Sequence, residues 1–187
     1  MSNAFPSELS DPSDGEVVRR VLAGDTEAYG LLVARHRHVL LRFAQRMLGD
    51  QSEAEDAVQD ALVRGYKALE QCEDPERVAA WLYAIVVNRC RTRSVQRHRR
   101  KQRFLRDDVA LHRAPAATPD ASEQLAKRDA LEAALASLDA DSRALFLMKY
   151  VDGVSYEEMG RTMGMGISAL KMRISRTRDR LRDILSK

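Results

Sequence analysis

Hydrophobic residues recur every three or four positions along most of this 187-residue chain, a spacing that places them on one side of an α-helix. The longest such series follows Asp25, a residue type that often caps the start of a helix, and it stops at Gly49. Its apolar side comprises Tyr29, Leu32, Val33, His36, Val39, Leu40, Phe43 and Met47. Aromatic residues are few, β-branched runs are short, and Ala, Leu, Arg and Glu are abundant. The pattern therefore predicts an all-α protein.

The other expected helices are bounded by residues that start or stop helices. A short helix is expected over residues 16–22, and another follows Ser52, which forms a capping box with Glu55. Pro75 is expected to open a helix with a buried stripe at Val78, Trp81, Leu82 and Ile85. Four more helices are expected to follow caps at Thr118, Asp139, Ser155 and Ser168.

These elements predict two helical domains. Residues 1–15 are rich in Ser, Pro and Asp and are expected to form a mobile tail, and residues 16–106 the first domain. From 107 to 120 the chain has no hydrophobic periodicity and contains two prolines, so a flexible linker is placed at 107–118. Residues 119–187 then form the second domain.

A helix-turn-helix is expected near the C-terminus. A short helix begins after Ser155 and ends before the turn Gly164-Met165-Gly166, and Ser168 caps the longer helix that follows. The longer helix packs through Leu170, Ile174, Thr177 and Leu181. Its other side carries Ser168, Lys171, Met172, Ser175 and Arg176, and Arg173 lies on the flank. Seven Lys or Arg against two Asp from residue 171 onward suit a DNA major groove between two rows of phosphates.

Charges in the first domain are separated along the sequence. Five acids and no cation lie between Asp50 and Asp60, and this acidic face is expected to bind a basic protein surface, with Asp56 and Asp60 exposed. The segment from Arg89 to Arg106 holds nine cations and no acid, for which a phosphate backbone is the natural counterion. The overall formal charge of +3 hides this asymmetry.

Aromatic, cysteine and histidine side chains say less about function than the charged residues do. Trp81 is interpreted as a core residue, whereas Tyr83 lies off the buried stripe and is the better candidate for an exposed ring that stacks on unpaired bases. Cys72 and Cys90 lack metal-type spacing and are interpreted as free thiols, although their spacing does not exclude a disulfide. His36 and the histidine two positions later point to different sides of a helix, so no metal site is expected.

Several function classes are disfavoured by the sequence. It contains no glycine-rich phosphate loop, metal-ligand cluster or nucleophile–base pattern, so neither an enzyme nor a bound cofactor is expected. No apolar run is long enough to insert in a membrane and no signal peptide is evident, which predicts a cytoplasmic protein. The main rival is a conventional transcription factor that binds duplex DNA without polymerase, but this leaves the acidic face and the basic run unexplained.

The order of these features resembles a bacterial RNA polymerase sigma factor of the extracytoplasmic-function class, over roughly residues 24–184. The run Ser-Glu-Ala-Glu-Asp-Ala-Val-Gln-Asp-Ala-Leu from Ser52 resembles the polymerase-binding helix of that family. The run Trp-Leu-Tyr-Ala-Ile-Val-Val-Asn from Trp81 resembles its promoter-melting helix, and residues 138–159 resemble the entry to its helix-turn-helix. Thr92 and the Ala169-Leu170 pair depart from the family pattern.

The resemblance implies a sigma-2-like and a sigma-4-like domain and gives each charge cluster a partner. Polymerase would be bound at its β′ clamp helices and β flap, and an anti-sigma factor is a further expected partner. The implied polymerase-binding residues are Glu53, Asp56, Gln59 and Asp60. The implied minus-10 set is Tyr83, Asn88, Arg91, Arg93, Arg97, Arg99 and Arg100, with residues 71–77 receiving an extruded base. The implied minus-35 set is Ser168, Lys171, Met172, Arg173 and Arg176.

Overall fold

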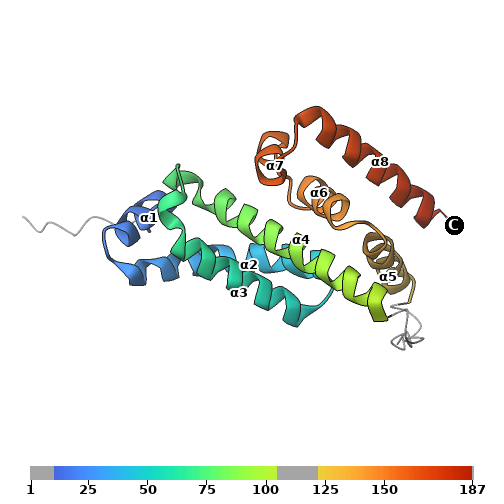
Figure 1. Cartoon of the computed structure of the whole chain (residues 1–187), viewed down its shortest axis with the longest axis horizontal. Coiled ribbons are helices and arrows are strands. Elements are labelled where there is room, and N and C mark those ends of the chain that lie inside the picture. The colour runs from blue at the N-terminus through green and yellow to red at the C-terminus, as the bar shows by residue number, and fades with distance from the viewer. Residues whose placement is uncertain (1–10, 105–121, 187) are drawn as a thin grey trace, which may run out of the picture.

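The computed structural model describes residues 11–104 and 122–186, and within these ranges every regular element is helical (Figure 1). The first range contains α1 (Asp14–Leu22), α2 (Tyr29–Leu48), α3 (Gln51–Lys67) and α4 (Val78–Phe104), with 3₁₀ turns at Thr26–Ala28, Leu69–Gln71 and Pro75–Arg77. The second contains α5 (Ser122–Ala136), α6 (Ala140–Tyr150), α7 (Tyr156–Met163) and α8 (Ile167–Leu185). The predicted fold class is confirmed. The expected linker and the expected helix start at Thr118 and Pro119 lie outside the described residues.

Two helices in the first range begin earlier than the sequence pattern predicts. Helix α1 starts inside the expected tail, because Ser13 and Glu16 form a capping box in which each side chain accepts a hydrogen bond from the other's backbone N–H. Helix α3 is capped by Asp50 rather than Ser52: the Asp50 carboxylate accepts from the backbone N–H of Glu53 at 2.8 Å. Gly49 ends α2 in the left-handed region, so the chain is already turned for α3 at the next residue.

The turn of the helix-turn-helix also differs in detail from the prediction. Gly164 ends α7 with φ 64°, and Gly166, not Ser168, is the N-cap of α8. The three residues between α7 and α8 are enough to redirect the chain because a glycine at φ > 0 carries no Cβ penalty. Ser168 therefore lies in the first turn of α8, where its side chain is exposed. The expected Ser155 cap is confirmed, and the apolar side of α8 is buried as predicted at Leu170, Ile174, Thr177 and Leu181.

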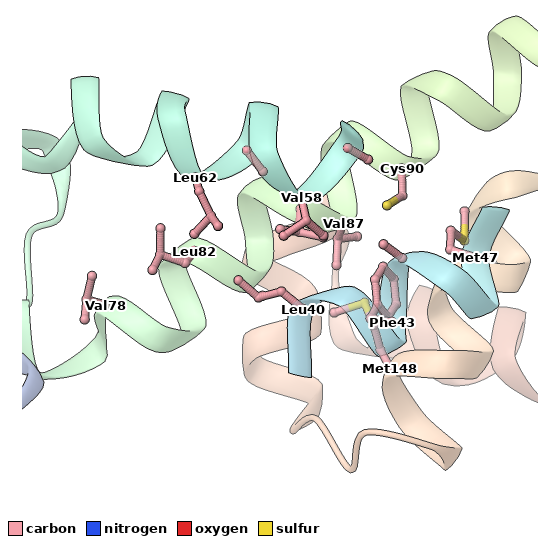
Figure 2. Packing of buried hydrophobic residues seen from close by; sticks show 14 of the residues in the cluster. Leu40, Phe43, Met47, Val58, Leu62, Val78, Leu82, Val87, Cys90 and Met148 are labelled. Atoms are coloured by element: carbon pink, nitrogen blue, oxygen red, sulfur yellow. The ribbon is translucent and has the colours of Figure 1, made fainter. Parts of the chain in front are cut away.

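Helices of both units share one hydrophobic core. Helices α2, α3 and α4 pack side by side, and α6 lies against α2 and α4. Figure 2 shows Met148 of α6 directed toward Phe43 of α2, beside Val58 and Val87. Phe43, Val87 and Met148 are each 0% exposed. The two units are therefore joined by a close-packed hydrophobic interior. Truncating one of its large side chains to alanine would typically lower the free energy of unfolding by about 2–5 kcal/mol.

Candidate nucleic-acid and polymerase interfaces

Helix α4 carries cations toward two different neighbours. Arg89, Arg93 and Arg97 follow one another at helical spacing on the side that meets α3. Arg91 lies on the side that meets the C-terminal unit, where it bonds to Asp141 of α6 and to Asn88 of its own helix. Because α4 continues without a break past the hydrophobic core, one rigid helix presents both groups of cations.

The α3-facing cations pair with the acidic face of α3. Arg89 lies 2.5 Å from Asp60, and Arg97 lies 3.6 Å from Glu53. Arg93 is 3.8 Å from Asp56. The two helices are antiparallel, so acids later in the sequence of α3 pair with cations earlier in the sequence of α4. Part of the basic partner that the acidic face was expected to require is therefore supplied by the chain itself.

The exposure of the acidic face divides its residues. The Asp56 side chain is 66% exposed, as predicted, but that of Asp60 is only 32% exposed and also receives a hydrogen bond from Arg64. The prediction that Asp60 is freely exposed is therefore wrong, because packing of α4 on α3 brings Arg89 over it. Gln59 and Glu55 are exposed and line a cavity of about 450 Å³ together with apolar groups. The apolar part of the lining is Tyr29, Val33, Leu62, Val63 and Tyr66.

Tyr83 does not present an exposed ring, contrary to the prediction. It is half-buried, its ring centroid lies 5.1 Å from that of Phe43, and its hydroxyl donates to Asp152 at 2.6 Å. Burial, together with the adjacent Asp152 carboxylate, raises the pKa of Tyr83 far above its ordinary value. Tyr66 is 40% exposed but packs on Tyr29 at the α2–α3 side. Trp81 is half-buried against the core.

A large open cavity lies between α4 and the C-terminal unit. It has a volume of about 860 Å³ and is bordered by residues 71–77, by α4, and by residues 152–162. Trp81, Tyr83 and Asn88 contribute to the α4 wall, and Asp152 and Glu158 to the opposite wall. The segment that the resemblance links to an extruded base therefore borders a hollow, and the C-terminal unit closes its other side.

The exposed side of α8 gathers four of the five residues implied in minus-35 binding. Ser168, Lys171, Met172 and Arg176 are all exposed, and Met172 is 54% exposed. Arg173 is different, because its guanidinium lies 2.6 Å from Asp139 and 3.4 Å from Asp141 and donates to the Ser142 hydroxyl. Ionic and hydrogen-bonded partners thus hold Arg173 against α6, while the other four face outward.

Models of two sigma-70 regions match this chain: region 2 over residues 32–104 and region 4 over residues 128–181. The sigma factor SigE of Mycolicibacterium smegmatis is 32% identical, in an alignment that covers 97% of this chain and 72% of that protein. The chain is an extracytoplasmic-function sigma factor of the sigma-70 family. The sigma-H factor of Pseudomonas aeruginosa is 29% identical, with 91% and 93% of the two chains covered.

Solved structures of other sigma factors resemble this one. CnrH, solved in complex with the cytosolic domain of CnrY, matches with a TM-score of 0.67 and 28% identity over 94% of this chain and 98% of that one. RpoE of Bartonella quintana, solved with the anti-sigma factor NepR, matches with a TM-score of 0.63 and 27% identity, over 84% and 96%. The sigma factor therefore has a region 2 that ends in α4 and a region 4 that contains the helix-turn-helix.

Region 2 of the sigma factor brings the implied minus-10 residues together only in part. Asn88 and Arg91 lie next to each other toward region 4, whereas Arg93 and Arg97 turn toward α3. Arg99 is exposed beyond these contacts, and the side chain of Arg100 lies outside the described part of the chain. Each arginine from Arg89 to Arg97 already has a carboxylate or a backbone carbonyl of the chain as partner, so contact with phosphate, the counterion that the sequence suggested, would require an exchange of partners.

Arg143, which no pattern in the sequence singles out, joins three helices of the sigma factor. Its guanidinium donates to the carbonyl of Met47 at 2.8 Å and to that of Leu135 at 2.7 Å. Arg97 donates in the same way to the carbonyl of Leu48, so two cations bind the end of α2, where backbone carbonyls lack helical partners. Burial, and then the nearby Arg97, lower the pKa of Arg143 below its ordinary value.

The remaining polar and sulfur groups have structural partners. His36 bonds to Asp14 at 2.7 Å and thereby ties α2 to α1. Cys72 and Cys90 are free, and burial raises the pKa of Cys90 to about 12. Within the part of the chain that the structure describes, no group of three or more His, Cys, Asp or Glu is placed to hold a metal. No helix in the same residues has the length and hydropathy to cross a membrane.

Proposed function

We propose that the sigma factor reads the minus-35 promoter element with the exposed side of α8. The supporting observation is that Ser168, Lys171, Met172 and Arg176 all face outward from the forward half of the second helix of a helix-turn-helix. In that position side chains reach base edges in a major groove, while cations farther along the helix meet phosphates. Arg173 contributes after release from Asp139 and Asp141.

Helix α4 is proposed to hold the minus-10 strand. Its contribution comes from Tyr83, Asn88 and Arg91 on one side, and from Arg93, Arg97, Arg99 and Arg100 along the basic end. A base extruded from the strand would enter the hollow that residues 71–77 border, where aromatic and polar side chains are both at hand. Most of the cations would contact phosphates, which gives affinity without sequence choice.

Core polymerase is proposed to bind the outer face of α3. Asp56 and Gln59 are exposed there, and Glu53 and Asp60 flank them at partial exposure. The matching surface is the basic clamp helices of the β′ subunit, with region 4 contacting the β flap. The apolar cavity beside Gln59 would accept a hydrophobic side chain of the partner, since an interface needs a buried apolar centre as well as charge.

Regulation and location follow from these partners. The two solved relatives are complexes, one with the anti-sigma factor NepR and one with the cytosolic domain of CnrY, and we propose an anti-sigma factor for this chain as well. Because its proposed binding partners are polymerase and promoter DNA, we place the sigma factor in the cytoplasm. Its role is recognition and melting of promoters and not catalysis of a chemical step.

The experiment that tests this function compares two arginines of α8 in reconstituted holoenzyme. Arg176→Ala should re-rank a panel of minus-35 variants, at a cost of about 1–3 kcal/mol for the preferred element if the guanidinium binds a base edge. Arg180→Ala is the matched control: Arg180 is also exposed, but it lies a turn farther along α8 and donates to Ser137. Its loss should leave the ranking unchanged. Equal rankings for both variants would contradict base reading by α8, and tight specific binding by the free protein would favour a conventional transcription factor.

A further inference from the structure

Two lysine ammonium groups face the ring of Tyr156, the first residue of α7. The Nζ of Lys149, in the last turn of α6, lies 4.3 Å from the ring centroid, and the Nζ of Lys171, in α8, lies 5.3 Å from it. Both distances fall within the roughly 6 Å at which the electron-rich face of an aromatic ring attracts a cation. One aromatic side chain therefore links α6 to a lysine of the proposed minus-35 surface.

The ring has a fixed place, because α7 is held at both ends. Ser155 caps its start by accepting from the backbone N–H of Glu158 at 3.2 Å, and the Tyr156 ring is half-buried against the hydrophobic core. At the other end, the N–H of Met165 donates to the carbonyl of Gly160 at 3.1 Å, and a Cβ at Gly160 would lie only 3.0 Å from the Met165 carbonyl oxygen. This tight turn packs the start of α8 on α7 (Figure 1), so the ring keeps a constant position relative to α8.

The Lys171 side chain, in contrast, has no such packing of its own. It is exposed, and a long lysine side chain loses rotamer freedom when its ammonium binds a base. A contact that favours one group of rotamers before binding reduces this entropic cost. At an exposed site, an ammonium on a ring face corresponds to a population shift of about twofold to fivefold.

A ring holds a cation differently from a carboxylate. Arg173, two residues after Lys171, is bound to Asp139 and Asp141 and must leave them before it can bind another anion. Among the described residues, Lys171 forms no ion pair with an acid. A ring face does not neutralise the ammonium and leaves N–H donors of its three free for other acceptors. Lys171 can therefore donate to a base edge while it stays on the ring.

Lys149 gives this arrangement a direction. It lies in the last turn of α6, where the helix dipole favours a cation, and it is the nearer of the two ammonium groups to the Tyr156 ring. Like charges beside one ring repel each other, so Lys149 disfavours the Lys171 rotamers that turn back toward α6. The rotamers that remain carry the Lys171 ammonium toward the exposed side of α8.

We propose that Tyr156 is a positioning residue for minus-35 recognition: its ring holds the Lys171 ammonium in the orientation from which it binds a base edge. This proposal rests on the proposed role of α8. The ring face supplies the effect, so Tyr156→Phe should retain recognition and Tyr156→Leu should not. A phosphate contact by the Tyr156 hydroxyl would give the opposite result, because Tyr156→Phe would then weaken all promoters alike.

The test measures competition binding of reconstituted holoenzyme to a panel in which each minus-35 base pair is replaced in turn. Lys171→Met first identifies the position that Lys171 reads, as the one at which the preference for a base is lost. At that position Tyr156→Leu should reduce the preference about twofold to fivefold, and Tyr156→Phe should match the wild type. In a Lys171→Met background Tyr156→Leu should have no further effect on preference, because the lysine through which it acts is absent. Tyr150→Leu is the matched control: it removes an exposed ring of the same unit that packs on Phe146, and it should leave the preference unchanged.

Two further measurements separate positioning from general support of the fold. In NMR spectra of the free protein, the ring current of Tyr156 should displace the ε-methylene proton resonance of Lys171. Tyr156→Leu should return this resonance to the value of a solvated lysine, and Tyr156→Phe should not. Replacement of Tyr156 by a trifluorinated phenylalanine keeps an aromatic ring in place but weakens its electron-rich face, so it should lower the preference as Tyr156→Leu does. This replacement keeps the test decisive should Tyr156→Leu not fold.

Three results overturn the proposal: equal preferences for Tyr156→Leu and Tyr156→Phe, an effect of Tyr156→Leu that persists in the Lys171→Met background, or a Lys171 resonance that is the same in all chains. Failure of the underlying function gives a different result. Lys171→Met would then leave the preference at every position unchanged, and both the reading by Lys171 and its positioning by Tyr156 would be wrong. If Lys171→Met removes a preference that Tyr156→Leu leaves intact, reading by α8 stands and the positioning is wrong.

Discussion

Replacing Arg143 by methionine should destabilise the chain by removing two charge-assisted hydrogen bonds that join three helices. The guanidinium donates to the carbonyls of Met47 in α2 and Leu135 in α5 from its position in α6. A hydrogen bond to a charged group contributes about 1.5–3 kcal/mol to stability. Since Arg143 is only half-buried, the lower end applies to each bond, and the expected loss is about 3 kcal/mol. Methionine keeps the unbranched aliphatic part of the arginine side chain, so the substitution leaves no large cavity that would add to this loss of stability.

The measurement is equilibrium urea unfolding of the full chain, followed by helical circular dichroism. For a protein of this size, about 3 kcal/mol lowers the melting temperature by roughly 6–12 °C. Arg182→Met is the matched control, because that arginine is exposed and lies 3.7 Å from Asp179 on its own helix. Its effect should stay within about 0.5 kcal/mol. A loss below about 1 kcal/mol for Arg143→Met, at an unchanged denaturant slope, would refute the claim that these carbonyls depend on the guanidinium.

Three further changes probe the two interfaces and the contact between the regions. Asp56→Lys should weaken the binding of core polymerase in a pull-down about tenfold, which corresponds to about 1.4 kcal/mol, and leave thermal stability unchanged. Asp60→Lys should weaken binding and also lower thermal stability, because Asp60 is paired with Arg89. Undiminished binding of polymerase by both variants would contradict docking on α3. Arg99→Ala should weaken all promoters alike and flatten the salt dependence of holoenzyme binding by about one phosphate contact, and re-ranking of promoters would assign it a different role. Burial disfavours ionisation of Glu158, but bonds from Ser155 and Arg77 prevail and lower its pKa below 4.5. The stability that this carboxylate contributes is therefore complete above about pH 4.5 and is lost as the pH falls through the folded-state pKa. Glu158→Gln should remove this contribution at neutral pH and leave stability at acid pH unchanged, so that the acid limb of the pH–stability curve becomes flatter; an unchanged limb would contradict the assignment.

Features that depend on local spacing could be predicted from the sequence. The buried positions Leu170, Ile174 and Leu181 repeat with the helical period, and Ser155 caps α7 as its spacing to Glu158 indicates. Local reasoning was less accurate at turns. Asp50 and Ser52 are both good caps, and only the direction in which Gly49 turns the chain selects the first.

Features that depend on distant partners could not be predicted. Tyr83 lies off the apolar stripe of its helix, yet region 4 covers it through Asp152, 69 residues away in the sequence. The pairing of Asp60 with Arg89 requires the register of two antiparallel helices, which no pattern within either helix contains. Arg143 binds backbone carbonyls, and a carbonyl at a helix end has no sequence signature. Charge composition thus showed where acids and cations gather along the chain but did not show which of these charges are paired with one another.

The ion pairs between α3 and α4 have a consequence for how this sigma factor can diverge. Asp60 belongs to the proposed polymerase surface and Arg89 to the start of the basic run, and Asp60 is the carboxylate that pairs with Arg89 while it also binds Arg64. The Nε of Arg89 is buried without a hydrogen-bond partner, so loss of Asp60 would leave that guanidinium poorly compensated. A substitution at Asp60 that suits an altered polymerase would therefore be deleterious until a second substitution arrives at Arg89. Substitutions at the two positions should therefore be coupled, and a change of partner at the proposed polymerase surface of α3 would constrain the sequence of α4 as well.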